Sequence, residues 1–293
     1  MHANVQRLLH WQALPLLPLP VMTDTLPRPC YTHPLEILWQ DDDMVVVYKP
    51  AGWLVHRTPI ARHETRFVLQ TLRDQIGRHV WPVHRLDQGT CGVLVFALHK
   101  EACQKLAEAF VAHTAHKHYL ALARGWLPAE VDVDYALLAD DAPPDAPAQS
   151  AQTLLRCLAT LDWPEAYDAR HPSTRVSLVE AFPRTGRRHQ IRRHLKHAAH
   201  PIIGDATHGK GPLNRWWAAR IGLQRLWLHA HALELPHPRT GERMRFVADW
   251  RQLAHCPEVQ QWQQLLQLPG WQAGPHPLPA SCGLELPGPA LPR

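Results

Sequence analysis

The sequence predicts an α+β fold, because strand and helix patterns follow one another in a mixed order and no internal repeat is present. The first two strands, Leu35 to Gln40 and Met44 to Lys49, are separated by three aspartates, which predicts a hairpin with an acidic turn. Phe67 to Ile76 then has the apolar spacing of an amphipathic helix. A hairpin that leads into a helix, followed by further strands and helices, is the order of an α+β protein.

The remaining elements follow from the same two periodicities, 2 for strands and 3.6 for helices. Strands are expected at Gly92 to Leu98, Lys117 to Ala123, Thr153 to Ala159, Thr174 to Phe182 and Leu226 to Leu235. Helices are expected at Lys100 to His113, His189 to Ala198 and Val259 to Leu266. The segment Ala139 to Gln149, ADDAPPDAPAQ, has the composition of a mobile surface loop.

The two ends of the chain differ from its centre in composition. Ala13 to Met22, ALPLLPLPVM, is too short to span a bilayer and is interrupted by three prolines, so we do not interpret it as a signal peptide. We expect residues 1–33 to be an extension that is disordered or untranslated, with Met22 as an alternative start. Residues 34–267 are expected to form the main domain, and residues 268–293 a loose tail rich in proline and glycine.

The segment HRLDQGTCGVLVFAL, from His84 to Leu98, holds the first candidate functional residue, Asp87. The glycines and threonine after the aspartate favour a turn, and the apolar run that follows predicts a buried strand. A carboxylate at the entrance of a strand is a candidate for catalysis, because it is ionised at neutral pH and can act as a nucleophile or a base. A lone aspartate in a turn is as often only a turn former, so this segment alone leaves both interpretations open.

A second segment, RTGRRHQIRRHLKHAAHPIIGD from Arg184 to Asp205, is strongly basic. Before Ala198 it holds six arginines or lysines and no acidic residue. A helix in this segment would place Arg188, Arg192 and Lys196 on one stripe. Such a density of cations is typical of a phosphate-binding surface. The other interpretation is a solvated basic helix face.

The bulk properties agree with a protein that binds a polyanion, without requiring one. A formal charge of +5 and an isoelectric point of about 9.0 favour a polyanionic partner, and the 22 histidines add positive charge at mildly acidic pH. The six cysteines form no CxxC pair, in a chain of 293 residues that is large enough to fold without disulfides. We therefore expect a reducing compartment and a cytoplasmic protein.

Taken together, these segments resemble the RluA-type family of RNA pseudouridine synthases. HRLD with its following threonine and glycine, TGRRHQIRRH, HPIIGD and LHAHALELPHPRTGE occur in that family's order, and matching segments cover about Leu35 to Trp250. Within the family, the sequence is most similar to the tRNA pseudouridine synthase C branch, which acts at uridine 65 of tRNA. KPAGWLVHR, LQTLRDQIGRHV and GLQRLWLHA carry this closer similarity. The resemblance implies a pseudouridine synthase catalytic domain with a mixed, mainly antiparallel bent sheet, flanking helices and a central RNA-binding cleft.

The resemblance also implies the reaction, which is the isomerisation of uridine to pseudouridine in tRNA without a cofactor or a metal. The uracil is detached from C1′ of its ribose, turned, and rejoined through C5. Asp87 is implied as the catalytic carboxylate, acting on C1′ or C6 or as a base at C2′. Arg192 is implied as the ion-pair partner that keeps Asp87 charged and oriented. Tyr119 completes the catalytic set by packing against the uracil ring and assisting proton transfer at C5.

Four further residues are expected to bind the RNA: Arg85, Arg187, Arg188 and His189. Arg85 would occupy the space that the flipped uridine leaves in the RNA. Arg187 and Arg188 are expected in a turn and at a helix start, where backbone N–H groups also favour phosphate. We expect tRNA as the partner, no membrane association, and a monomer.

Three positions depart from the family's usual pattern. His118 stands where relatives mostly have arginine, so we expect phosphate affinity there to be weaker or pH-dependent. Gln88 replaces an arginine and Cys91 replaces a serine in the segment that begins with HRLD. We interpret Cys91 as a small, nearly buried residue and not as a nucleophile, because the sequence identifies no partner histidine and carboxylate for it.

Three alternative interpretations stay open. His194, His197 and His200 recur every three residues, and such spacing on a helix can bind zinc, although the neighbouring cations would repel a metal ion and the HExxH pattern is absent. The same chemistry on ribosomal RNA or at another tRNA position is the second alternative. A non-catalytic RNA-binding protein is the third, although the three expected catalytic residues are all present.

Overall fold

The computed structural model describes residues 34–57, 64–139, 142–143 and 146–286 of the chain. Its strands are β1 (Ile37–Gln40), β2 (Met44–Lys49), β3 (Trp81–Pro82), β4 (Cys91–Ala97), β5 (His116–Arg124), β6 (Glu130–Asp134), β7 (Gln152–Trp163), β8 (Thr174–Pro183), β9 (Leu228–Pro236), β10 (Arg243–Val247) and β11 (Trp271–Ala273). Its helices are α1 (Val68–Ile76), α2 (Lys100–Val111), α3 (Gln190–His197), α4 (Gly211–Ile221), α5 (Pro257–Leu266) and the short 3₁₀ helix η1 (Ala280–Cys282).

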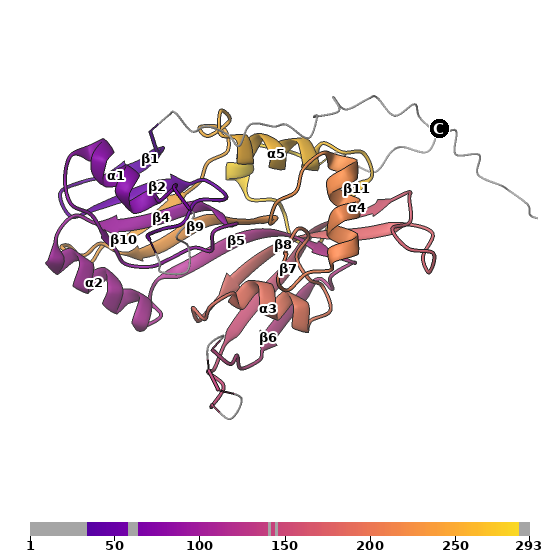
Figure 1. Cartoon of the computed structure of the whole chain (residues 1–293), viewed down its shortest axis with the longest axis horizontal. Helices are drawn as coiled ribbons and strands as arrows, with labels where there is room; N and C mark the ends of the chain where they lie inside the picture. Colours follow the sequence, from indigo (N-terminus) through magenta and orange to yellow (C-terminus); the bar gives the residue numbers. More distant parts are fainter. Residues whose placement is uncertain (1–33, 58–63, 140–141, 144–145, 287–293) are drawn as a thin grey trace, which may run out of the picture. The chain divides into compact units, whose positions relative to one another are not determined.

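The strands join into one sheet with the order β1-β2-β4-β9-β5-β8-β7-β11, and β10, β3 and β6 pair with β9, β4 and β7. These pairs are antiparallel except the pair of β4 with β9, which is parallel. Helix α2 packs on β3, β4 and β9, and α3 packs on β7 and β8 (Figure 1). The predicted α+β fold with a mainly antiparallel sheet and flanking helices is confirmed.

Every strand and helix expected from the sequence is present, with ends that shift by a few residues. The acidic turn of the first hairpin forms because the Asp41 carboxylate accepts the backbone N–H groups of Asp43 and Met44, both at 2.8 Å. Five elements were not predicted from the sequence: β3, β6, β10, β11 and α4. The four strands are short or pair along one edge only, which weakens their apolar alternation. Helix α4 begins with Gly-Pro, which reads as a turn although proline fits the first turn of a helix.

The core lies between the sheet and its helices and is rich in tryptophan. Strand β4 is buried along its whole length, as expected for a continuous apolar run. Trp262 of α5 packs against the rings of Trp227 and Trp250, with centroids 5.0 and 6.0 Å away. Burying a large apolar side chain of this kind stabilises the fold by about 2 kcal/mol. Five tryptophans are almost fully buried: Trp217, Trp227, Trp250, Trp262 and Trp271.

The expectation of a loose tail from Leu268 onward is wrong for residues 268–286. Strand β11 pairs with β7, and the backbone N–H of Trp250 donates to the carbonyl of Ser281 at 2.9 Å. Trp271 and Cys282 are buried and anchor this segment, although the proline and glycine content around them is typical of a loop. Residues 287–293, the extension 1–33 and part of the loop at 139–149 lie outside the described residues. Among the described helices, none is both long and apolar enough to cross a membrane.

The parallel contact between β4 and β9 depends on Gly92. Gly92 pairs with Ala230 and has a φ of +117°, a backbone conformation that other residues rarely adopt. A Cβ atom at this position would lie 2.1 Å from the carbonyl oxygen of Ala230. Glycine here therefore allows the two central strands to approach each other directly beside the loop that carries Asp87.

Replacing Gly92 with alanine should strongly destabilise the fold. We expect the free energy of unfolding to fall by about 3 kcal/mol or more, because the backbone must move to relieve both the clash and the strained φ. The matched control is Gly77→Ala at the end of α1, where φ is +67° but no atom lies within 4 Å of the added Cβ, and we expect a loss of about 1 kcal/mol. Denaturant unfolding measures both values. Equal losses in the two variants would contradict a role for close strand approach.

Candidate active site

A cavity of about 570 Å³ lies where the loop before β4, the C-terminal end of α2, the start of β5 and the segment between β8 and α3 meet. These segments are far apart in the sequence and are brought together by the central order β4-β9-β5-β8 of the sheet. The cavity is lined by both apolar and basic groups. Most of the residues that the sequence analysis singled out line it: Arg85, Asp87, Tyr119, Arg187, His189 and Arg192.

Asp87 lies in the turn that leads into β4, with its carboxylate directed toward Arg192. The turn closes through a hydrogen bond from the N–H of Thr90 to the carbonyl of Asp87 at 3.1 Å. Nη1 of Arg192 donates to Oδ2 of Asp87 at 3.0 Å. Oδ1 of Asp87 lies 3.8 Å from Nε2 of His189. The structure thus brings together a carboxylate and a guanidinium that are 105 residues apart in the chain.

Beneath this turn lies Lys49, a fully buried lysine at the end of β2. Its Nζ donates to three backbone carbonyls, those of Pro50 at 3.0 Å, Gln88 at 3.1 Å and Thr90 at 2.7 Å. Burial lowers the pKa of Lys49 to about 7. Three acceptors match the three N–H bonds of an ammonium group. Two of them, the carbonyls of Gln88 and Thr90, belong to the Asp87 turn, so Lys49 holds this turn in place. This role of Lys49, the first residue of the KPAG segment, was not predicted from the sequence.

Strand β5 directs Lys117 and Tyr119 into the cavity and His118 to the opposite face, because successive strand residues alternate. Burial raises the pKa of Tyr119, and the negative charge of Asp87 raises it further, so the phenol is neutral at physiological pH. Burial, and then the charge of Arg187, lowers the pKa of Lys117 to about 8.

His118 does not contact the cavity, so its expected effect on phosphate affinity is wrong. Its Nε2 lies 2.6 Å from a carboxylate oxygen of Glu180, and its ring stacks on Phe182 with centroids 4.8 Å apart. The side chain is buried on the far face of β5. The basic-basic-tyrosine pattern therefore supplies one cleft cation, Lys117, and one buried histidine.

The basic segment differs in one respect from the sequence-based expectation. Helix α3 begins at Gln190, so Arg188 precedes the helix and does not lie on a helical stripe with Arg192 and Lys196. Arg188 is exposed and is not among the residues that line the cavity, whereas Arg187 and Arg192 are. The backbone N–H of Arg187 donates to Oε1 of Gln190 at 2.9 Å. This N–H group is therefore satisfied within the protein, which corrects the expectation that it would face phosphate.

His189 adopts a left-handed backbone conformation with φ of +55°, which costs energy for a residue with a Cβ. This conformation turns its ring into the cavity next to Asp87, and its Nδ1 lies 3.0 Å from Nε2 of His208. Strained residues of this kind gather at functional sites. His189 was expected as an RNA contact, whereas His208 was not predicted, because it stands in a segment without a recognisable motif.

Two neighbours of Asp87 show how the departures from the family pattern are accommodated. Gln88 donates to the carbonyl of Gly52 at 3.3 Å and to Glu64 at 2.9 Å, and so links two loops at the surface. Cys91 has no exposed surface, which confirms its interpretation as a small buried residue. The structure does give its thiol a partner that the sequence did not reveal, because Nδ1 of His229 lies 3.3 Å from Sγ.

The histidines with helical spacing each contact a separate group. Nε2 of His194 lies 3.0 Å from the carbonyl of Tyr135, His197 stacks on the ring of Tyr135, and Nδ1 of His200 lies 2.8 Å from the carbonyl of Arg124. These contacts hold α3 against the sheet and the loop after β6.

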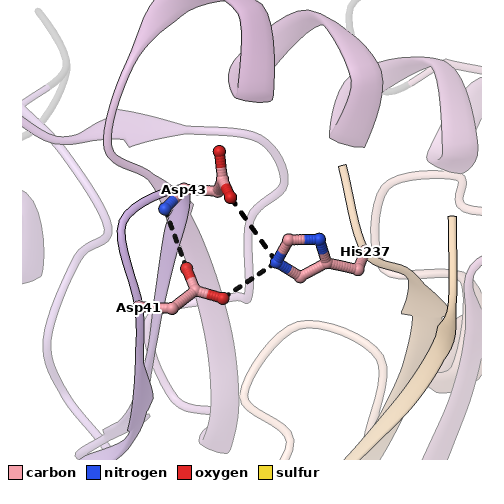
Figure 2. Close-up of side chains that lie close together, drawn as sticks. All are labelled: Asp41, Asp43 and His237. Atoms are coloured by element: carbon pink, nitrogen blue, oxygen red, sulfur yellow. Dashed lines mark hydrogen bonds and ion pairs between the residues drawn. The ribbon is translucent and has the colours of Figure 1, made fainter. Parts of the chain in front are cut away.

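Within the described part of the chain, Asp41, Asp43 and His237 lie close enough together at the first hairpin to be potential metal ligands (Figure 2). Asp43 also accepts hydrogen bonds from Arg239 at 2.9 Å and lies 2.9 Å from Nε2 of His99. Arg239 and His99 already satisfy this carboxylate. The group therefore acts as a polar network that ties the β1–β2 turn to the segment after β9.

Comparison with known proteins gives a consistent result. Residues 43–197 match the protein family described as RNA pseudouridylate synthase. The chain is 45% identical over 245 residues to tRNA pseudouridine synthase C of Vibrio cholerae, covering 81% of this chain and 97% of that protein. It is 44% identical over 250 residues to tRNA pseudouridine synthase C of Yersinia pestis, covering 83% and 94%.

Solved structures with the same fold include two human proteins. Human RNA pseudouridylate synthase domain containing 1 superposes with a TM-score of 0.57 at 25% identity, covering 73% of this chain and 82% of that chain. Human RNA pseudouridylate synthase domain containing 4 gives a TM-score of 0.56 at 26% identity, covering 78% and 93%.

Replacing Lys49 with methionine should destabilise the protein, because the buried carbonyls of Pro50 and Thr90 lose the Lys49 donor while the apolar volume is kept. An unsatisfied buried acceptor costs about 1–3 kcal/mol, so we expect the free energy of unfolding to fall by about 3 kcal/mol or more. Lys105→Met on the exposed face of α2 is the matched control and should change it by less than about 0.5 kcal/mol. Thermal or denaturant unfolding measures the difference. A Lys49→Met variant as stable as the control would show that the lysine does not hold the turn.

Proposed function

The chain belongs to the RNA pseudouridylate synthase family, whose members are isomerases, and from this premise we propose that it converts uridine to pseudouridine in tRNA, at position 65. One observation carries the proposal. The carboxylate of Asp87 lies in the cavity with Oδ2 hydrogen-bonded to Arg192 and with the phenol of Tyr119 lining the same space. We further propose that the protein is cytoplasmic and acts as a monomer.

In the proposed reaction, the N1–C1′ bond of uridine breaks, a C5–C1′ bond forms, and the proton on C5 is replaced by one on N1. Atoms and electrons balance without a redox partner, so no cofactor is needed. Asp87 supplies the carboxylate, and Oδ1 is its reacting oxygen, because Oδ2 is held at 3.0 Å by Arg192. The fixed guanidinium keeps the carboxylate oriented and charged once RNA displaces water from the cavity.

Tyr119 has the proposed role of packing against the uracil ring and assisting the loss of the proton from C5. Burial and the charge of Asp87 both raise its pKa, so the phenol enters the reaction in its neutral form. A neutral phenol can relay this proton, because its oxygen can accept the C5 proton as its own hydroxyl proton passes on toward N1 of the uracil, so no preformed phenolate is required.

The tRNA substrate is supported by the relatives named tRNA pseudouridine synthase C, which match at 44–45% identity over more than four fifths of this chain. Position 65 follows from the same resemblance. The base is reached by flipping, with Arg85 as the side chain that fills the vacated space. Arg187, Arg188 and His189 are proposed to contact the RNA, since all three lie in or beside the mouth of the cavity.

The function is tested by incubating the purified protein with unmodified tRNA transcripts and mapping pseudouridine at single-nucleotide resolution. We expect modification at uridine 65 by the wild-type protein. Asp87→Asn should form no product while binding tRNA within a few fold, because the amide keeps the shape of the carboxylate but is not a nucleophile or a base.

Asp132→Asn, an exposed change on β6, is the matched control and should leave product formation unchanged. Efficient modification of a ribosomal RNA fragment or of another tRNA uridine, with position 65 unmodified, would contradict the proposal that uridine 65 of tRNA is the substrate. Product formation by the Asp87→Asn variant would contradict the role of Asp87.

The pKa of Lys117 predicts how tRNA affinity depends on pH. Below about pH 8 its ammonium is charged and attracts phosphate, and above that pH it is neutral, so affinity should fall as the pH rises through 8. The loss of one phosphate contact should weaken binding by about three- to tenfold between pH 7 and 9. Lys117→Arg should remove this dependence, because arginine stays charged throughout the range. Binding titrations measure it, and a wild-type affinity that is flat between pH 7 and 9 would rule the idea out.

A further inference from the structure

The guanidinium of Arg192 is held by a second carboxylate, that of Asp205, which has no exposed side-chain surface. Nε of Arg192 donates to Oδ2 of Asp205 at 2.7 Å, and Nη2 donates to Oδ1 at 2.7 Å. This two-point contact fixes the plane of the guanidinium. The remaining nitrogen, Nη1, then points at Asp87. One arginine therefore links a buried carboxylate to the carboxylate in the cavity.

The same aspartate also supports the other side of Asp87. Oδ1 of Asp205 accepts the backbone N–H of His208 at 2.9 Å, and the ring of His208 lies 3.0 Å from that of His189. His189 in turn faces Oδ1 of Asp87 at 3.8 Å. Both protein groups that flank the Asp87 carboxylate, Arg192 and His189, are thus connected to Asp205.

The backbone around Asp205 is itself tightly held. The side chain of Asn214 on α4 donates to the carbonyl of Asp205 at 2.9 Å and accepts the N–H of Gly204 at 2.9 Å. A Cβ on Gly204 would lie 1.6 Å from the carbonyl of Arg225, and a Cβ on Gly209 would lie 2.3 Å from the carbonyl of Asp205. The loop therefore has little freedom to move the carboxylate.

We propose that Asp205 is a positioning residue for the reaction, which fixes Arg192 and the His208–His189 pair so that the Asp87 carboxylate presents one oxygen to the uridine. This inference rests on the proposed function. It goes beyond it by assigning the last residue of the HPIIGD segment a role in turnover. A buried ion pair is weak support for stability, because desolvation offsets most of its attraction, so geometry is the better explanation for this one.

A purely structural role would lower stability without changing the chemical step, and the test separates the two. Asp205→Asn replaces one of the two carboxylate oxygens with an NH₂ group, which cannot accept a hydrogen bond. Only one of the two hydrogen bonds from Arg192 can then form. We expect the single-turnover rate at saturating tRNA to fall by about ten- to a hundredfold, with the tRNA dissociation constant changed by less than about threefold.

Arg192→Lys is the second variant, and it does not depend on whether Asp205 tolerates substitution. Lysine keeps the charge but cannot bond two carboxylates in fixed directions, so we expect a similar loss of rate. Because both changes act through the same contact, the double variant should be slower than either single variant by less than about twofold.

Asp43→Asn is the matched control, because Asp43 is also a buried aspartate bonded to an arginine, Arg239, but lies in the network of Figure 2 outside the cavity. It should lower stability and leave the single-turnover rate within twofold of wild type.

An Asp205→Asn rate within twofold of wild type would overturn the proposal. If that variant does not fold, an Arg192→Lys rate within twofold of wild type would overturn it instead. A wild-type protein that forms no pseudouridine would overturn the proposed function itself. That result differs from the one that overturns the role of Asp205, in which the wild-type protein is active and the variants are equally active.

Discussion

The arrangement of the site depends on one side chain, the guanidinium of Arg192, which lies almost buried between two carboxylates. Burial alone would lower the pKa of Arg192, but Asp205 and then Asp87 raise it above its usual value, so the group is permanently charged. For Asp205, burial would raise the pKa, yet its bonds to Arg192 and to the N–H of His208 hold it below the usual range. Asp205, Asp87 and Arg192 together carry two negative charges and one positive charge, so the group has a net negative charge. Asp87 is the member of this group that is partly exposed to solvent, in the cavity.

The fold provides the three anchor points of this arrangement from separate parts of the chain. Lys49 at the end of β2 holds the Asp87 turn through the carbonyls of Gln88 and Thr90, and helix α3 carries Arg192 on its buried side. The loop before α4 supplies Asp205. Gly92 lets β4 and β9 approach each other, so these segments converge at the centre of the sheet. A cavity that must accept a polyanion can hold a carboxylate only if cations outnumber it, and Arg85, Lys117 and Arg187 line the same space.

The sequence predicted the parts of this site that are carried by local pattern. Asp87 in a turn before an apolar run, and Arg192 in a basic segment with five other cations, stand in motifs of adjacent residues, and the resemblance to a family that these motifs carry implied their roles. Asp205, His208 and Lys49 were not assigned, because the resemblance implied no role for them and their contacts, to residues 13, 19 and 39 positions away, are visible only in the folded chain. His118 was misjudged since the motif alone did not state which face of β5 each residue occupies. The edge strands and the C-terminal segment were missed because pairing on one side leaves little apolar alternation.

In the proposed reaction, an extruded uridine enters the cavity beside the Asp87 carboxylate that Arg192 holds. A crystal structure of the Asp87→Asn variant bound to a tRNA acceptor and T-arm hairpin tests this arrangement directly. We expect uridine 65 to lie outside the stem, with its ribose next to residue 87, its uracil against Tyr119, and Arg192 still bonded to Asp205. A complex in which uridine 65 stays paired, or in which the RNA crosses the opposite face of the sheet, would contradict it.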